Sequence, residues 1–546
     1  MASAAITGGE PGGMSRRPRL DVGLHPAGRW IFAALLFGGL TYAGFSILTD
    51  TAQVGEQLAV GVFLFLGLAL VIALGFEFVN GFHDTANAVA TVIYTHSMPA
   101  PLAVVWSGAF NFLGVVLSSG AVAYSIVTLL PVDLVLHVGS APGYAMIFAL
   151  LLAAVIWNLA TWWVGLPNSS SHALIGSVLG VGLMNQLLSH DAGTAGVDWA
   201  QAEKVLAALL FSPLLGFAGA FLLLLVLKRV APDPALYREP QGNQPPPRGI
   251  RALLVFTCTA VSFAHGGNDG QKGMGLIMLI LIGCAPTAYA LNRTMPESAT
   301  AAFVGSATAS QRVFERYSGS VQIDAAAARG NLTEDLRQRH IGGATFASLV
   351  ALSSDVTRRI QGYGSLRKVP AAATPNLRND MYLVLDASKL VTADEGMRSR
   401  MSVADMDIVK TYTAQLEQGT RYIPGWVKLT VALALGLGTM VGWRRIVVTV
   451  GERIGRTHLT YGMGASAELM AASTILLAEQ FGLPVSTTHI LSSGVAGASV
   501  ANGAGLQRRT VRNMALAWVL TLPAAMLIAG GLYWLLLQCV HLVSLG

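Results

Sequence analysis

Two distant stretches of the chain repeat one unusual pattern: "GLPNSSSHALIGSVLG" (residues 165–180) and "GLPVSTTHILSSGVAG" (residues 482–497). Each copy places Gly-Leu-Pro before a run of hydroxyl-bearing residues and a histidine, in otherwise hydrophobic sequence. The 546 residues are 53% hydrophobic and 12% charged, whereas soluble domains average about 25% charged residues. Apolar runs long enough to cross a bilayer recur at 30–48, 58–74, 145–164, 205–227 and 514–537. The sequence therefore predicts an all-α polytopic membrane protein.

The density of charged residues divides the chain into a membrane part and a polar part. Of the 129 residues in 293–421, 29 are charged, against 35 in the remaining 417, so this segment is predicted to lie outside the membrane. We expect a disordered tail (1–27), a first membrane repeat region (28–228), a polar Pro-rich loop (229–251), the start of a second membrane repeat (252–292), the polar insertion (293–421) and the remainder of the second repeat (422–546).

The formal net charge of +6 is modest and does not indicate a nucleic-acid partner. Basic residues cluster in 228–251 and 444–456, and such clusters are typical of cytoplasmic loops in membrane proteins. Both segments are accordingly expected on the cytoplasmic side of a cell membrane.

A second pattern occurs once before each Gly-Leu-Pro segment: "NGFHDTANAVATVI" (80–93) and "AHGGNDGQKGMGLI" (264–277). Each holds an aspartate, Asp84 or Asp269, among glycines that we expect to break a helix. From this aspartate to the first hydroxyl residue of the next segment, the chain runs 85 residues in the first half and 217 in the second. The excess nearly equals the insertion, so the two halves form an internal repeat. Such repeats are typical of secondary transporters, most often with inverted topology.

The Gly-Leu-Pro segments interrupt hydrophobic runs, and irregular backbone at membrane depth must line a protein cavity. Proline favours the first turn of a new helix, whose free N–H groups attract anions. The predicted anion-binding residues come from both copies and include one nearby lysine: Ser169, Ser170, Ser171, Ser486, Thr487, Thr488 and Lys272. An alternative interpretation is that the segments are ordinary helix N-caps.

Placing a carboxylate inside a membrane costs free energy, so a carboxylate found there usually serves the protein's function. Beside an anion site they would repel the substrate unless a cation or proton binds with it. The candidate coupling-ion ligands are Asp84, Asn87, Asn268, Asp269, Glu468 and Glu77, with Asp84 and Asp269 also candidates for a metal ion. The alternative for Asp269 is a structural ion pair with Lys272, one helical turn away. His83, His172, His265 and His489 are either packing residues or proton relays.

Three classes of function compete for these residues. A serine hydrolase would need one nucleophile, but the hydroxyl runs are duplicated and the chain has no Gly-x-Ser-x-Gly pattern. A channel has no need of buried acids beside an anion site. A cation-coupled anion transporter accounts for both features, so we expect no enzymatic activity and no cofactor.

The four quoted motifs, in this order, closely resemble the Pit-type inorganic phosphate transporters, above all the bacterial low-affinity, proton-coupled branch. The resemblance extends from about residue 76 to the C-terminus. It implies that the two hydroxyl segments are re-entrant hairpins that hold phosphate and that the two Asn/Asp segments bind coupling cations. It also implies a homodimer that imports phosphate with protons, in some members as a soluble metal–phosphate complex.

The chain departs from the family's pattern in two places. Asn168 of the first copy corresponds to Val485 of the second, and Leu151 stands at the position equivalent to Glu468. The absent second acid favours proton over sodium coupling, although sodium-coupled phosphate symport stays open. The family also includes sulfate carriers, so a sulfate or other tetrahedral oxyanion is the alternative substrate.

Overall fold

The computed structural model describes residues 18, 20, 26–130, 139–188, 197, 199–240, 244–319 and 321–545, without the side chains of 85–87, 200 and 541–545. Within these residues the regular structure is helical apart from one isolated bridge between Gly455 and Leu506. The all-α prediction is therefore confirmed. The predicted disordered tail falls largely outside the described residues.

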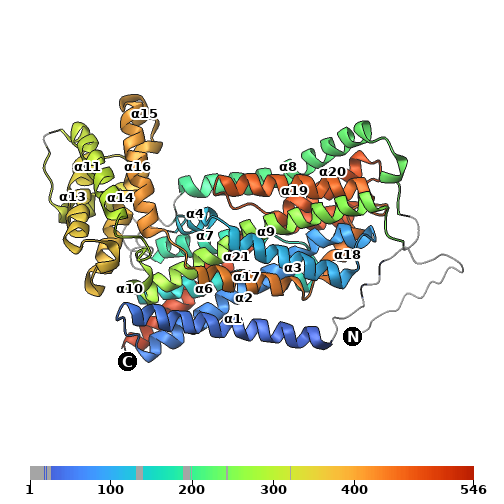
Figure 1. The fold of residues 1–546 in the computed structure, drawn as a ribbon, viewed down its shortest axis with the longest axis horizontal. Helices are drawn as coiled ribbons and strands as arrows, with labels where there is room; N and C mark the ends of the chain where they lie inside the picture. Colours follow the sequence, from blue (N-terminus) through green and yellow to red (C-terminus); the bar gives the residue numbers. More distant parts are fainter. Residues whose placement is uncertain are drawn as a thin grey trace, which may run out of the picture.

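The membrane part contains most of the long helices. Among the described residues, eight helices are long and apolar enough to cross a membrane, or nine if one bent pair is counted as a span. The elements are α1 (Pro26–Gln53), α2 (Val60–Tyr94), α3 (Ala100–Leu117), α4 (Ala121–Val127), α6 (Ala141–Trp163), α7 (Ser170–Leu188), α8 (Trp199–Val230), η1 (Pro234–Leu236), α9 (Arg248–Cys284), α10 (Pro286–Tyr289), α17 (Gly425–Thr439), α18 (Arg444–Glu452), α19 (Tyr461–Gln480), α20 (Thr487–Ala501) and α21 (Arg508–Leu545). In Figure 1 the long helices of this part lie side by side along the horizontal direction.

The insertion forms a group of helices at one end of the membrane part (Figure 1). They are α11 (Ala299–Ser318), α12 (Ala325–Gln338), α13 (Thr345–Tyr363), η2 (Leu366–Lys368), η3 (Ala371–Ala373), α14 (Thr374–Ala393), α15 (Glu395–Arg400) and α16 (Val403–Thr420). Their apolar faces bury a hydrophobic cluster of their own, with Phe314, Leu332 and Tyr412 fully buried. Asp324, Asp394 and Ser402 cap α12, α15 and α16 by accepting backbone N–H hydrogen bonds.

The two halves of the membrane part pack reciprocally. Helix α3 packs on α9 while α17 packs on α2, and α7 packs on α21 while α20 packs on α8. The last glycine of each repeated stretch marks the closest approach: a Cβ on Gly180 would lie 2.2 Å from the Met526 carbonyl oxygen, and one on Gly497 would lie 2.1 Å from that of Phe217. Only glycine fits at such contacts. Each half is therefore held by its counterpart.

The prediction that the aspartate segments are broken is wrong. Helices α2 and α9 run without interruption through Asp84 and Asp269. Their glycines instead admit neighbouring helices, since a Cβ on Gly81 would lie 2.3 Å from the Leu435 carbonyl oxygen and one on Gly266 would lie 2.1 Å from that of Asn111. The bent pair is α17 and α18, which meet at 57°.

Candidate functional site

The two Gly-Leu-Pro turns have the same backbone structure. Gly165 and Gly482 adopt left-handed φ angles of 70° and 64°. In the first turn the N–H of Gly165 donates to the carbonyl of Trp162 at 2.9 Å, and in the second the N–H of Gly482 donates to that of Glu479 at 2.9 Å. The following leucine N–H donates back five residues in both turns, at 3.1 and 2.9 Å. This left-handed glycine cap ends α6 and α19 in the same way.

The first hydroxyl residue of each copy caps the next helix. The Oγ of Ser169 accepts from the N–H of His172 at 3.1 Å, and the Oγ of Ser486 accepts from the N–H of His489 at 3.2 Å. The N-cap alternative thus applies to these two serines. The prolines were expected in the first helical turn, but α7 and α20 begin three residues after them. The serine caps hold the helix starts, and the prolines stiffen the connection.

One hydroxyl residue of each copy, the second of the first copy and the third of the second copy, contacts Asp84. Ser170 donates its Oγ–H toward Asp84 Oδ2 at 2.7 Å, and Thr488 donates to Oδ1 at 2.7 Å. The Oγ of Ser170 also lies 2.6 Å from Asn80 Oδ1, although a hydroxyl has one proton to donate. The Asp84 carboxylate, 3% exposed, therefore joins the beginnings of α7 and α20.

Lys272 links the second aspartate to the turns. Its Nζ donates to Asp269 Oδ1 at 2.6 Å and to the Val485 carbonyl oxygen at 3.3 Å, and it forms a short hydrogen bond to Ser171 Oγ. Ser171 in turn donates to the same Val485 carbonyl at 2.8 Å. The ion pair of Asp269 with Lys272, which was the alternative interpretation, is present, and the same ammonium also reaches Ser171, a predicted substrate residue.

The two aspartates lie in one cluster with His265. One ligand atom from each of Asp84, His265 and Asp269 lies within 4.8 Å of the others, and His265 Nε2 is 3.5 Å from Asp269 Oδ2. Two carboxylates and an imidazole are suitable ligands for a small cation or a divalent metal ion. With His265 neutral, the two ionised carboxylates and the Lys272 ammonium carry one net negative charge.

The remaining predicted residues lie around the cluster of Asp84, His265 and Asp269, which we call the buried centre. Asn268 Nδ2 donates to the Leu483 carbonyl oxygen at 3.2 Å, while its Oδ1 has no hydrogen-bond partner among the described residues. Thr487 Oγ1 is likewise buried without a described partner. The side chain of Asn87 lies outside the described residues.

Glu77 and Glu468 are both fully buried but lie on different neighbours. Glu77 packs against Gly273, where a Cβ would lie 2.3 Å from its Oε1. Asn80 is also adjacent to Glu77, yet neither carboxyl oxygen makes a hydrogen bond of good geometry among the described residues. Glu468 accepts from Thr257 Oγ1 at 2.5 Å. Each acid is therefore buried and makes few hydrogen bonds among the described residues.

The histidines divide into two groups. His83 Nδ1 lies 3.1 Å from Asp84 Oδ1, and His265 Nδ1 lies 3.0 Å from Asn111 Oδ1. His172 and His489 instead pack against one another, with ring centroids 4.5 Å apart and the rings tilted by 42°, and His489 stacks on Trp518 at 4.2 Å. The first pair contacts the carboxylate cluster, whereas the second packs the helix starts together.

The sequence analysis missed some polar residues near the centre. The Oδ1 of Asn80 lies 2.6 Å from the Oγ of Ser170, and Asn80 lies one helical turn before Asp84, a spacing that places both on one face. Gln271 Nε2 donates to Glu479 Oε1 at 2.9 Å, close to the second Gly-Leu-Pro turn. No periodicity points to the Val485 carbonyl, because a backbone acceptor leaves no mark in the sequence.

The comparisons with known proteins match most of the chain, including both Gly-Leu-Pro turns and both aspartate segments. A model of the "Phosphate transporter family" matches residues 80–529. The low-affinity inorganic phosphate transporter PitA of Escherichia coli (strain K12) is 42% identical over 504 residues, covering 89% of this chain and 98% of that protein. PitB of the same strain is 39% identical over 506 residues, covering 89% of this chain and 100% of PitB. A solved structure described as a sodium-dependent phosphate transporter aligns at 18% identity with a TM-score of 0.48, covering 87% of this chain and 99% of that one.

Proposed function

The chain belongs to the phosphate transporter family, and from this premise we propose that it imports inorganic phosphate across the cell membrane by proton symport. It is an inorganic phosphate transporter of the Pit type and a multi-pass membrane protein. The observation that carries the finer proposal is the joint contact of Ser170 and Thr488 with the two oxygens of Asp84. An acid held by both hydroxyl segments couples its protonation to the structure of the anion site.

Charge favours coupling to a cation. Asp84, Asp269 and Lys272 together carry one net negative charge when ionised, in a buried setting. Two unit charges 4 Å apart interact by about 4 kcal/mol at an effective dielectric constant of 20. A phosphate anion would therefore be repelled until a proton or cation neutralises the excess carboxylate. This requirement supports symport and gives Asp84, Asn268, Asp269, Glu77 and Glu468 their proposed roles as coupling-ion residues.

The hydroxyl segments supply donors suited to an oxyanion. Ser171, Thr487 and Thr488, the first-turn N–H groups of α7 and α20 and the Lys272 ammonium would hold phosphate. Phosphate, unlike sulfate, keeps a proton near neutral pH, and an acceptor carboxylate such as Asp84 would recognise it. A divalent metal carried with the phosphate would find oxygen ligands in Asp84 and Asp269.

We also propose alternating access, which the reciprocal packing of the two halves supports. The Gly165 turn lies beside Arg445 of α18, whereas the Gly482 turn lies near Ala121 of α4, at the insertion end. Two hairpins that enter from opposite ends and meet at Asp84 support the proposal of inverted repeats with re-entrant tips. Rocking of one repeat against the other would expose the centre to each side in turn. The proposed homodimer is open to a direct mass measurement in detergent.

The test is uptake of radiolabelled phosphate into proteoliposomes that hold the purified full chain. We expect uptake driven by an inward proton gradient, without sodium, that excess sulfate does not inhibit. Adding magnesium tests whether the metal–phosphate complex is the transported species. Uptake driven only by sodium would overturn proton coupling, and strong inhibition by sulfate would favour the alternative substrate.

A further inference from the structure

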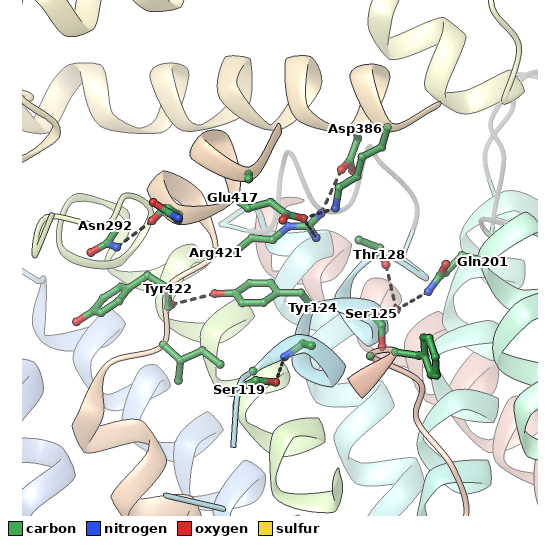
Figure 2. A pocket seen from close by; sticks show the side chains of 18 of the residues that line it. Ser119, Tyr124, Ser125, Thr128, Gln201, Asn292, Asp386, Glu417, Arg421 and Tyr422 are labelled. Carbon is green, nitrogen blue, oxygen red and sulfur yellow. Dashed lines mark hydrogen bonds and ion pairs between the residues drawn. The ribbon is translucent and has the colours of Figure 1, made fainter. Parts of the chain in front are cut away.

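A cavity of about 1410 Å³ lies between the insertion and the membrane part. Helices α14 and α16 provide one wall, while α4, the start of α8 and the start of α17 provide the other. Figure 2 shows Asp386, Glu417 and Arg421 of the insertion gathered on one side of it, and Gln201 of the membrane part on the other side, turned toward Ser125. We call this cavity the vestibule.

The floor of the vestibule is the second Gly-Leu-Pro turn. Residues 480–483 line the cavity. The same segment reaches the candidate site on its other side, because the Leu483 carbonyl accepts from Asn268 and the Val485 carbonyl accepts from Lys272 and Ser171. A short stretch of backbone therefore separates the cavity from the buried centre.

The two walls are tied together by defined contacts. Arg421 pairs with Asp386 at 3.2 Å and Glu417 at 3.1 Å, and its guanidinium lies 5.6 Å from the centroid of the Tyr124 ring in α4. Tyr124 donates its hydroxyl to the Tyr422 carbonyl oxygen at 2.9 Å. The Arg421–Tyr124 contact joins the insertion to the membrane part, and the ion pairs of Arg421 fix its guanidinium in place.

The vestibule has cationic side chains in excess. Its three acids are Asp386, Asp394 and Glu417, and its basic residues are Lys204, Arg339, Lys389, Arg421 and Lys428. The described ion pairs join Lys389 to Glu417 and Arg421 to Asp386 and Glu417. Lys204 is exposed, and Lys428 donates only to the Ser118 carbonyl oxygen among the described contacts. An anion entering the cavity would therefore find positive charge on the membrane wall.

The distribution of basic residues indicates which side this cavity faces. The helix ends remote from the insertion carry Lys228, Arg229, Arg248, Arg251, Arg444 and Arg508. In the short segments at the insertion end of the membrane helices, Lys204 and Lys428 are the basic residues that line the cavity. By the positive-inside rule the insertion lies on the non-cytoplasmic side.

From this geometry we propose that the vestibule is a second, outer binding site for the oxyanion, at which phosphate collects before it passes the Gly482 turn. The insertion then takes part in transport, because its residues form one wall of this outer site. Lys204 and Lys428 attract the anion, and field lines concentrated in a low-dielectric cleft raise its local concentration. This inference rests on the proposed function.

The first experiment reverses one charge and measures external phosphate uptake by cells that express the full chain. Lys204→Glu should raise the KM for phosphate about three- to tenfold without changing maximal velocity, and high salt should shrink the difference. Lys204→Arg should restore the normal KM. Lys410→Glu is the matched control, because this exposed lysine of α16 lies outside the cavity lining. Equal KM values in wild type and Lys204→Glu would overturn the proposal, as would an equal rise in Lys410→Glu.

A second experiment blocks the cavity from outside. Ala414 lines it and is exposed, and among the native cysteines Cys539 is the exposed one. In a Cys539→Ser background, Ala414→Cys should react with a membrane-impermeant anionic thiol reagent added outside, slow phosphate uptake, and be protected by phosphate. Reaction only from the cytoplasmic side, or modification without effect on uptake, would overturn the vestibule. If the wild-type chain transports no phosphate at all, the proposed function itself fails.

Discussion

The turn at Gly165 and the turn at Gly482 have the same backbone conformation, but different kinds of contact hold them in place. The first is anchored by side chains: Asn168 Oδ1 accepts from Thr521 Oγ1 of α21 at 2.5 Å, and Trp518 donates to the Pro167 carbonyl oxygen at 3.1 Å. The second, with Val485 at the equivalent position, is held through its backbone carbonyls by Asn268, Lys272 and Ser171.

Because of this difference, the two turns should respond differently when the substrate or a proton binds. The first turn is tied to a long neighbouring helix by polar side chains, so it should move with α21. The second is tied to the charged residues of the centre, and it also lines the vestibule. A change in the protonation of Asp269, the partner of Lys272, would therefore act directly on the second turn. We infer that the second turn is the responsive one and the first the more fixed.

The largest effect is expected at the residue that joins the two turns. Asp84→Asn removes the charge that must be neutralised but keeps an oxygen acceptor for Ser170 or Thr488. Accumulation of phosphate against a gradient should fall at least about 100-fold, while the thermal unfolding midpoint in detergent stays near that of wild type. Normal accumulation in this variant would remove Asp84 from the coupling mechanism.

The next largest effect is expected at the second aspartate, Asp269, which depends on its ion pair with Lys272. Lys272→Met leaves the fully buried Asp269 carboxylate without its ammonium partner, which should cost about 3–5 kcal/mol of stability. Thermal unfolding of the purified protein measures the loss. The double variant Lys272→Met, Asp269→Asn should recover most of the stability while remaining inactive. A stable single variant would show that the carboxylate is protonated or paired elsewhere.

Smaller changes are expected from the hydroxyl groups on Asp84. Ser170→Ala and Thr488→Val each remove one hydrogen bond to a charged group, worth about 1.5–3 kcal/mol. Because both bonds converge on the proposed site, the KM for phosphate should rise roughly tenfold or more in each. Ser177→Ala is the control, since this buried serine donates to the Ala173 carbonyl within its own helix. A KM shift in one variant only would show that one turn, and not both, contacts the substrate.

The smallest effect tests the equivalence of the two backbones. Gly165→Ala and Gly482→Ala each place a side chain at a left-handed φ angle, with neighbours at ordinary contact distances of 3.9 and 3.4 Å. Each should lose about 1 kcal/mol of stability through backbone strain alone. Gly503→Ala provides the reference, because its φ is 75° and the space around it is open. Losses that differ clearly between the first two would mean that the surroundings, and not the backbone, set the cost.

Much of this architecture follows from the sequence. The apolar runs predicted the long helices, and the duplicated Gly-Leu-Pro stretches predicted two breaks of the same form, which the matching hydrogen bonds of Gly165 and Gly482 bear out. The chemistry of these breaks is local, since a left-handed glycine and a serine N-cap act within a few residues. Local chemistry of this kind can be predicted without knowledge of the fold.

Other features depended on packing. Glycines near Asp84 and Asp269 predicted breaks, yet both helices continue because those glycines admit the backbones of α17 and α3. The spacing of residues gives no sign that Ser170 and Thr488 meet on one carboxylate, or that the insertion closes a cavity over the Gly482 turn.

The sequence by itself thus determined the membrane class, the family and the local form of both turns, because periodicity, hydrophobicity and capping act over short distances. The tertiary structure alone decided which charges neighbour which hydroxyls, because those contacts join residues hundreds of positions apart. In a low-dielectric interior, such neighbours set the electrostatic cost of holding an anion.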